Sequence, residues 1–369
     1  MSDKITWIPF DKMEAFMKDV FIGVGVPADD AAICANVLIT SDKRGIDSHG
    51  TNRLKPIYYD RIKAGIQQPV TNFEIVKEGP TSVVVDGHDG MGHVIAKKTM
   101  DILIEKAKKY GMAMGAVRNS THYGFAGYYP LMAIEHGMIG ITGTNARPSI
   151  APTFGVENML GTNPITFGMP SDEPFPFVLD CATSITQRGK IELYAREGKP
   201  CPAGLVIDRE GNTKTDSVQI LDDLVKGRAA LTPLGGPGED LGGYKGYGYA
   251  TVVEILSAAL QAGSFLKMLN GVDENGKKCP YHLGHFFIVV NIEAFTELDS
   301  FKKTTGDILR ALRNSQKAPG AQRIYTAGEK EYLVWLDRKD KGVPVNDELM
   351  KDIIALKKEL NLTQYDFGF

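Results

Sequence analysis

The middle of the chain alternates short apolar runs with stretches of helical spacing, and this pattern limits the fold more than any other feature. Four apolar runs, each with turn residues on both sides, are 82–86, 112–117, 137–144 and 177–181. Helices are expected from the glycines after residue 86 to about residue 110, and near 125–136 and 184–197. Strands and helices of this length in alternation predict an α/β core.

The two ends of the chain have helical patterns instead. Apolar residues recur at a three-four spacing from Phe10 to a stop at Gly23. A second helix is expected after Pro27, ending at Lys43-Arg44-Gly45, and a third from about Asn52 to Gly65. The tail from residue 298 to 360 is again largely helical. We therefore expect a helical N-terminal region (1–75) to pack with a helical C-terminal region (295–369), around an α/β core (76–294) that binds cofactor and substrate.

Two further segments stand out between these regions. Residues 198–245 are rich in glycine and proline and predict a long functional loop or an insertion. The most apolar helix, Tyr249–Leu266, is interrupted by Glu254 and is shorter than the roughly 20 residues that span a bilayer. It is therefore interpreted as a buried core helix.

Composition excludes several classes of function. A formal net charge of -3 argues against a nucleic-acid-binding or membrane-surface protein, either of which would carry a basic stripe. The four cysteines have no CxxC spacing and are interpreted as reduced thiols. Only His282 and His285 approach a metal-ligand spacing, and two histidines alone favour a structural role, so no metal is expected. The stretch MSDKITWIPF has no signal-peptide pattern, and the expected location is the cytoplasm.

An ordinary dinucleotide-binding domain is not expected. The G-x-G-x-x-G fingerprint has only two near misses, Gly90-Met-Gly92 and Gly246-Tyr-Gly248, and neither has the third glycine or a clear preceding strand. If the chain binds a dinucleotide, it uses different loops.

The densest polar cluster is Arg44-Gly-Ile-Asp-Ser48-His49-Gly50-Thr-Asn-Arg53, between two amphipathic helices. Histidine exchanges protons near neutral pH, and arginine binds a carboxylate through two parallel hydrogen bonds. If residues 49–53 already turn as a helix, His49 and Arg53 share a face. The alternative is that Asp47 or Ser48 caps a helix and that His49 is a packing residue.

Further polar groups follow the expected strands. His122 follows the run 112–117 and Arg147 follows 137–144, which are positions where α/β folds place ligand groups. Thr183 or Ser184 is a candidate N-cap whose helix would bind a pyrophosphate, and Lys190 would point toward the same cleft. The segment 234–243 would wrap a nucleotide or act as a flexible lid.

Several motifs together resemble one family, the malate/L-lactate dehydrogenases of the non-Rossmann type, which also include ureidoglycolate, sulfolactate and diketogulonate oxidoreductases. They occur in one order from about residue 5 to residue 330, and they are RGIDSHGTNRL, NSTHYG, NARPSIAPTFG, LGTNPITFGMP, DCATSITQRGKI, GYKGYGYA and GHFFIVVNIEAF. The resemblance implies the family's own α/β fold with a mixed sheet, and assembly as a homodimer.

The resemblance also implies roles for individual residues. His49 would donate the proton to the 2-oxo group, with Ser48 as its relay partner and Arg53 on the substrate carboxylate. His122 would be the second active-site histidine, to which some members assign the acid/base role, so both assignments stand. Arg147 would bind a second carboxylate, which suits a diacid such as malate.

The implied cofactor is NAD, with NADP possible. Asp180, Cys181 and Ala182 would line its pocket together with Thr183, the Gly235 region and Gly328-Glu329. Thr326-Ala327 stands where Leu-Pro is commoner in the family, which weakens the contacts assigned to Gly328-Glu329, and Asn291 stands where the family often has Asp.

The expected function is hydride transfer between NAD(P)H and a small 2-oxo or 2-hydroxy acid, either malate/oxaloacetate or L-lactate/pyruvate. Lys190, counted with the catalytic candidates, occupies a position where members that reduce cyclic imines carry an acid, and so favours hydroxy acids. The alternatives are a reductase of a sugar acid, ureido acid or cyclic imine, and a nucleotide-binding protein without catalysis.

Overall fold

A seven-stranded sheet forms the centre of the computed structural model, which describes residues 5–369. Its strands, in spatial order, are β2 (Glu74–Glu78), β3 (Ser82–Asp86), β4 (Met112–Ser120), β10 (Leu283–Asn291), β5 (Met138–Thr144), β6 (Ile165–Met169) and β7 (Phe177–Cys181). The pair β3–β4 is parallel and the other neighbouring pairs are antiparallel. The predicted mixed sheet is therefore confirmed, and β2, β6 and β10 are its strands beyond the four apolar runs.

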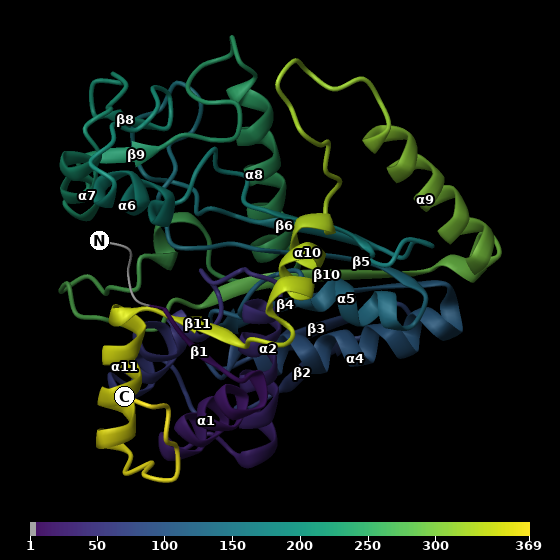
Figure 1. Ribbon diagram of the computed structural model, residues 1–369, viewed down its shortest axis with the longest axis horizontal. Helices are drawn as coiled ribbons and strands as arrows, with labels where there is room; N and C mark the ends of the chain where they lie inside the picture. The colour runs from purple at the N-terminus through teal and green to yellow at the C-terminus, as the bar shows by residue number, and fades with distance from the viewer. Residues whose placement is uncertain (1–4) are drawn as a thin grey trace.

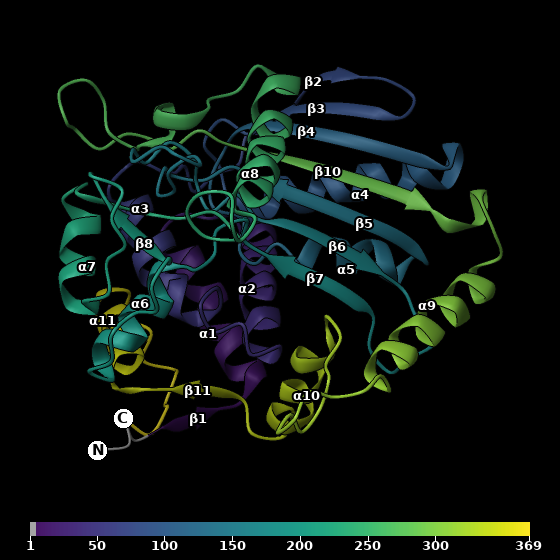
Figure 2. The same ribbon diagram turned by 90° about the horizontal axis from the view of Figure 1, so that it is seen from above.

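Helices cover both faces of this sheet. Figures 1 and 2 show α4 (Gly92–Tyr110) and α5 (Tyr128–Glu135) on one face and α8 (Gly243–Ala258) on the other. The first face is closed by an apolar core that α4 and α5 form with alternate side chains of the central strands, such as Val83, Val117 and Phe287. Alternation along each strand sends every second side chain to that core.

The N-terminal helices pack against the end of the chain. The helices α1 (Phe10–Gly23) and α2 (Ala28–Lys43) agree with the first two predicted helices. They share one apolar core with α11 (Asp347–Glu359), and β1 (Thr6–Ile8) pairs with β11 (Val343–Val345). The third predicted helix is instead three short pieces, a 3-10 turn η1 (Thr51–Arg53), a π-helix η2 (Leu54–Tyr59) and the short α3 (Asp60–Lys63).

The glycine- and proline-rich segment is more ordered than predicted. It carries α7 (Ser217–Val225) and the antiparallel pair β8 (Val206–Asp208) and β9 (Ala229–Leu231), which pack with α6 (Arg188–Arg196) around a small core of their own. The tail holds α9 (Leu298–Arg313) and α10 (Glu329–Arg338), and three further 3-10 turns are Ala259–Gln261, Leu266–Leu269 and Ile292–Ala294. Among the described residues, no helix combines the length and apolarity that a membrane span requires.

The prediction of a buried core helix over Tyr249–Leu266 is wrong in two respects. The helix α8 ends at Ala258, where a 3-10 turn and Ala262 in the left-handed region (φ 52°) redirect the chain. Its outer face is also exposed, and Tyr249 and Ile255 keep 59% and 54% of their surface accessible. Apolar residues lie all around this helix, but the sheet covers only the side that carries residues such as Val253.

A buried histidine links the three central strands. His285 of β10 lies with Nδ1 2.7 Å from Thr144 Oγ1 of β5 and Nε2 2.8 Å from Ser120 Oγ of β4. Its ring stacks on Tyr123 with centroids 4.4 Å apart. Burial lowers the pKa of His285 from the ordinary 6.5 to about 3, so the ring is neutral at physiological pH.

We predict that acid destabilises the fold through His285. Between its unfolded pKa of about 6.5 and its folded pKa of about 3, the unfolded chain binds a proton that the folded chain does not. Stability that is fully present above pH 6.5 is then lost by up to about 1.4 kcal/mol per pH unit as pH falls. Urea unfolding of His285→Gln at about pH 7.5 and about pH 5.5 should show a smaller loss than the wild type.

The control for this experiment is His136→Gln, at the exposed C-terminal end of α5. It should lose as much stability on acidification as the wild-type protein. An equal loss in His285→Gln and His136→Gln would contradict the prediction.

Candidate active site

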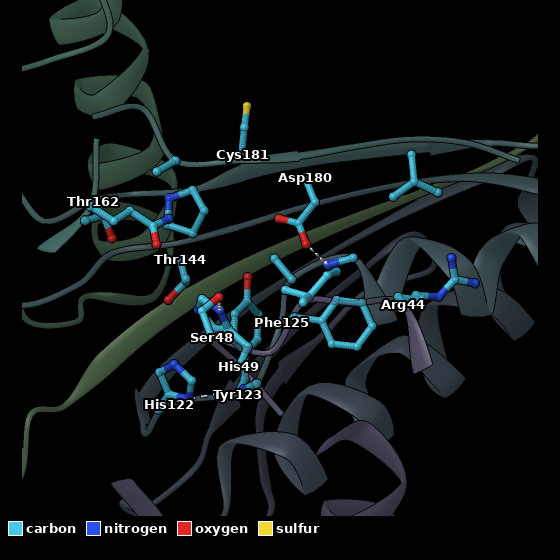
Figure 3. Close-up of a pocket in the computed structure, with 18 of the residues that line it drawn as sticks. Arg44, Ser48, His49, His122, Tyr123, Phe125, Thr144, Thr162, Asp180 and Cys181 are labelled. Atoms are coloured by element: carbon cyan, nitrogen blue, oxygen red, sulfur yellow. Dashed lines mark hydrogen bonds between the residues drawn. The ribbon is translucent and has the colours of Figure 1, made fainter. Parts of the chain in front are cut away.

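One pocket collects most of the polar residues singled out in the sequence. It has a volume of about 380 Å³ and lies between the segment after α2, the segment after β4, the ends of β5 and β7, and the start of α10. Figure 3 shows His49 and His122 near each other at one part of this pocket and Asp180 at another. Pockets of this size hold small ligands and parts of cofactors.

A buried carboxylate fixes the segment that carries His49. Asp42, near the end of α2, accepts hydrogen bonds from the Thr51 N–H (2.9 Å) and the Thr51 hydroxyl (2.5 Å). Arg338 of α10 donates to the Asp42 carbonyl (2.9 Å) and forms an ion pair with Asp47. Burial raises the pKa of Asp42 to about 7, although the bonds from Thr51 act in the opposite direction. The hydrogen bonds between Asp42 and Thr51 thus hold the two ends of the segment 42–51 together.

His49 lies within the segment 42–51. Its Nδ1 is 2.9 Å from Ser48 Oγ, and Arg53 donates a hydrogen bond to the Ser48 carbonyl. Burial, and then the nearby positive charge of Arg53, lower the pKa of His49 from 6.5 to about 4. The ring is therefore neutral at pH 7 and able to accept a proton. His49 also lines the pocket, which favours the functional interpretation over that of a packing residue.

His122 faces His49 from the segment after β4. The two rings are stacked, with centroids 5.7 Å apart and an interplanar angle of 16°. Tyr58 Oη lies 2.6 Å from His122 Nδ1, and the Gly124 N–H donates to the same nitrogen at 3.3 Å. Burial, and then the neighbouring His49 and Arg61, hold the pKa of His122 well below its ordinary range.

Arg53 and Arg61 lie close enough to the histidines to lower the pKa of His122, and Arg147 lies near Arg61. Burial lowers the pKa of Arg61, and the positive charges of Arg147 and Arg53 lower it further. The Arg61 guanidinium also lies over the Tyr281 ring, 4.5 Å from its centroid. Among the described residues, no carboxylate forms an ion pair with any of these three arginines. Unpaired cations beside a pocket favour an anionic ligand, because a charged partner would offset their desolvation and mutual repulsion.

The opposite part of the pocket is formed by the end of β7. Asp180 accepts hydrogen bonds from the Gly127 N–H (2.7 Å) and the Thr166 hydroxyl (3.0 Å), and burial raises its pKa. Each carboxylate oxygen keeps a further lone pair for a ligand hydroxyl or amide. Cys181 points to the other side in Figure 3, as alternation along a strand requires.

The lining suits a nicotinamide cofactor. Apolar side chains such as Phe125 and Leu131 offer contact for a planar ring, the Asp180 carboxylate offers hydrogen-bond acceptors, and glycines such as Gly127 and Gly328 keep the backbone accessible. Within residues 5–369 no three His, Cys, Asp or Glu side chains gather as metal ligands would.

Comparison with known proteins places the chain in a family. Its sequence matches the family model for malate/L-lactate dehydrogenase over residues 8–354. The chain belongs to the malate/L-lactate dehydrogenase family. Members of this family are dehydrogenases of 2-hydroxy acids, which implies a nicotinamide cofactor.

Similar relatives agree with this assignment. The crystal structure of malate dehydrogenase from Entamoeba histolytica is 43% identical with a TM-score of 0.94, covering 99% of this chain and 100% of that one. A malate dehydrogenase from Pyrococcus abyssi is 42% identical, covering 96% of this chain and 95% of its own length. An L-sulfolactate dehydrogenase from Methanocaldococcus jannaschii is 36% identical, covering 95% and 96%. The expected non-Rossmann fold of this family is confirmed.

The structure brings together about half of the site residues predicted from the sequence. Those that line the pocket are Ser48, His49, His122, Asp180, Cys181, Ala182 and Gly328. Arg53 and Arg147 do not line the pocket: Arg53 donates a hydrogen bond to the Ser48 carbonyl, and Arg147 is exposed near Arg61.

Four other predicted residues lie outside the pocket lining. Lys190 is exposed and lies over the Tyr194 ring at 5.3 Å, so it does not point into the cleft as expected. Glu329 is buried and forms an ion pair with Arg323. Gly235 is needed for a close approach within its own loop, because a Cβ there would lie 2.6 Å from the Gly242 carbonyl carbon.

The N-cap predicted at Thr183 or Ser184 is also wrong. The helix α6 begins only at Arg188, and the Thr183 hydroxyl instead donates to the Asn163 carbonyl at 2.9 Å. A strand end followed by a threonine looks like a cap in sequence, but here the hydroxyl fixes a bend in the connecting segment.

Sequence analysis missed three residues that the structure places at the histidines or behind them. Tyr58 and Arg61 fall within the expected third helix and Asp42 falls within α2, so the helical pattern did not single them out. A polar residue inside the expected apolar stripe, such as the Tyr58 hydroxyl, was the signal available for the first of them.

The hydrogen bonds between Asp42 and Thr51 lead to a prediction for Gly50. A Cβ at Gly50 would lie 1.8 Å from Asp42 Oδ1, so Gly50→Ala must displace the carboxylate that holds Thr51. We expect Gly50→Ala to lower kcat by about 10²-fold or more, because small misplacements at a reacting centre have effects of this size. Steady-state kinetics and a thermal melt of the purified variant measure this.

Gly189→Ala is the matched control, since a Cβ at this position in α6 meets nothing within 4 Å. It should leave kcat unchanged and keep or slightly raise the melting temperature. Wild-type kinetics in Gly50→Ala would rule out the hydrogen bonds between Asp42 and Thr51 as a determinant of activity.

Proposed function

We propose that this protein is an NAD-dependent dehydrogenase that interconverts malate and oxaloacetate. The observation that carries the proposal is the stacked pair His49 and His122 near Arg53 and Arg61, with Arg147 beside Arg61; among the described residues no carboxylate forms an ion pair with these arginines. A 2-hydroxy acid with a second carboxylate supplies one anionic group for Arg53 and another for Arg61 and Arg147. The relatives named malate dehydrogenase support the same substrate.

The chain's own residues would move the proton of the reaction. When bound, the nicotinamide cofactor exchanges a hydride with the carbon that carries the hydroxyl. Neutral His49 accepts the hydroxyl proton of the 2-hydroxy acid, and protonated His49 returns it in the reverse direction. Burial is the main cause of the low pKa of His49 and the charge of Arg53 is the second. A substrate carboxylate beside Arg53 would offset the second cause and so favour the protonated form of His49.

The residues proposed to hold the cofactor are Asp180, Ala182 and Gly328, which line the pocket away from the histidines. We propose NAD as the cofactor, and the comparison of NADH with NADPH in the assay below tests this choice. All four cysteines are free thiols, which supports the cytoplasm as the proposed location.

We expect His49→Ala to lower kcat by about 10²- to 10⁴-fold, which is the usual contribution of a positioned acid/base group. NADH binding, followed by fluorescence, should stay nearly unchanged, because His49 is proposed to touch the substrate rather than hold the cofactor. The assay is oxidation of NADH and NADPH with oxaloacetate, pyruvate and other 2-oxo acids.

Each outcome of this assay has a clear meaning. Turnover of oxaloacetate ahead of pyruvate supports the dicarboxylate proposal, and pyruvate ahead of oxaloacetate would make the protein an L-lactate dehydrogenase. Full activity in His49→Ala would overturn the role of His49. No turnover of any 2-oxo acid by the wild-type protein would overturn the proposed function.

We also propose a homodimer that covers the outer face of α8. This face and the segment after it expose Tyr249, Val252, Ile255, Phe265 and Met268, each with 47% to 59% of its surface accessible. Apolar patches of this kind on a soluble protein mark an interaction surface, and closed twofold pairing is the commonest way to cover one.

Ile255→Lys should separate the dimer, because a lysine at the centre of this patch would be desolvated without a partner. Size-exclusion chromatography with light scattering should then give the mass of one chain instead of two. Val218→Lys is the control, since Val218 is 67% exposed on α7, outside the patch. A wild-type mass equal to one chain would contradict the dimer.

A further inference from the structure

The hydrogen bonds at His122 Nδ1 determine where this ring carries its proton. The Gly124 N–H lies 3.3 Å from Nδ1, and a backbone N–H can only donate. Nδ1 must therefore present its lone pair to Gly124. In a neutral imidazole one nitrogen accepts and the other donates, so the proton of His122 is on Nε2.

Tyr58 reinforces this assignment. Its hydroxyl lies 2.6 Å from His122 Nδ1. Because burial raises the pKa of Tyr58, the phenol stays protonated and donates a hydrogen bond to Nδ1. Two donors then face one nitrogen. A proton added at Nδ1 would displace one donor and repel the other, in a site where burial and nearby cations already hold the pKa of His122 low.

The backbone around the ring is specialised for this arrangement. Tyr58 belongs to the π-helix η2 (Leu54–Tyr59), a geometry that is rare and concentrated at functional sites. Gly124 has φ 84°, and a Cβ there would lie 2.5 Å from Val37 Cγ1, so only glycine brings this N–H to the ring.

The Nε2 atom is left for a ligand. Among the described residues, none forms a hydrogen bond with His122 Nε2. The ring lines the pocket and is stacked on His49, so both histidines are within reach of one bound molecule.

We infer that His122 is a fixed neutral hydrogen-bond donor, whose Nε2–H holds the substrate's reacting oxygen, while the proton itself moves to and from His49. Tyr58 is the positioning residue that keeps His122 in this form. The inference rests on the proposed function. In oxidation, the O–H bond would break and its proton go to His49, while the C–H bond of the same carbon breaks, its hydride goes to the oxidised nicotinamide cofactor and the C=O bond forms. The N–H bond of His122 stays intact throughout.

Such a donor stabilises the charge that develops on the oxygen. Its strength comes from being fixed beforehand in a site of low dielectric constant, and one donor of this kind contributes about 10²- to 10³-fold to kcat. A neutral donor needs no proton exchange with solvent, whereas His49 must lose its proton in every turnover.

Glutamine substitutions separate the two roles, because a glutamine amide donates a hydrogen bond but cannot transfer a proton. We expect His122→Gln to keep kcat within about tenfold of the wild type, and His49→Gln to lose about 10²- to 10⁴-fold. His122→Leu, which lacks a donor, should lose about 10²- to 10³-fold. A kcat of His122→Gln as low as that of His49→Gln, with NADH binding intact in both, would overturn the division.

A second measurement begins with the wild-type protein and needs no turnover. ¹⁵N NMR of the wild-type protein with labelled histidine distinguishes the two tautomers, and His122 should be neutral with its proton on Nε2 at pH 7. In Tyr58→Phe the Nδ1–H form should become detectable and kcat should fall, with the KM for NADH unchanged. A proton on Nδ1 in the wild-type protein would overturn the inference. An Nε2–H tautomer in a protein without dehydrogenase activity would instead leave the ring geometry intact and remove the proposed function.

Discussion

The hydrogen bonds of His285 hold together the part of the molecule on which the site depends. His285 lies on β10, which enters the sheet from far along the chain and separates β4 from β5. The segment with His122 leaves β4 just beyond Ser120, and the segment with Arg147 leaves β5 just beyond Thr144. A neutral ring between two hydroxyls satisfies its own polar atoms, and it fixes the two strand ends from which the site is built.

Burial determines the charge of the site more than ion pairing does. The histidines lose their charge because they are desolvated beside arginines, and Asp180 takes its hydrogen bonds from neutral donors. The arginines keep their positive charge without carboxylate partners among the described residues. The two histidines are therefore neutral rings near positively charged arginines, an arrangement that favours an anionic ligand.

Sequence patterns predicted the elements in which one periodicity applies from end to end. The helices α1 and α2 and the strand β3 have the predicted bounds, because their apolar spacing is regular and their ends carry glycine or charge. The division of the chain at residues 75 and 295 stays a prediction. Exposure was harder to predict: the apolar residues of α8 indicated burial correctly on one side, but a sequence does not say whether a second layer of the same chain covers the other.

The site was predictable where motif residues line the pocket themselves, as His49, His122 and Asp180 do. It was not predictable where a residue acts through another. Tyr58 has the spacing of a packing residue only if every turn has 3.6 residues, and the π-helix gives it a different direction, toward His122. A departure from regular helix costs backbone stability, so its presence beside the His122 ring supports the hypothesis that the orientation of this ring matters.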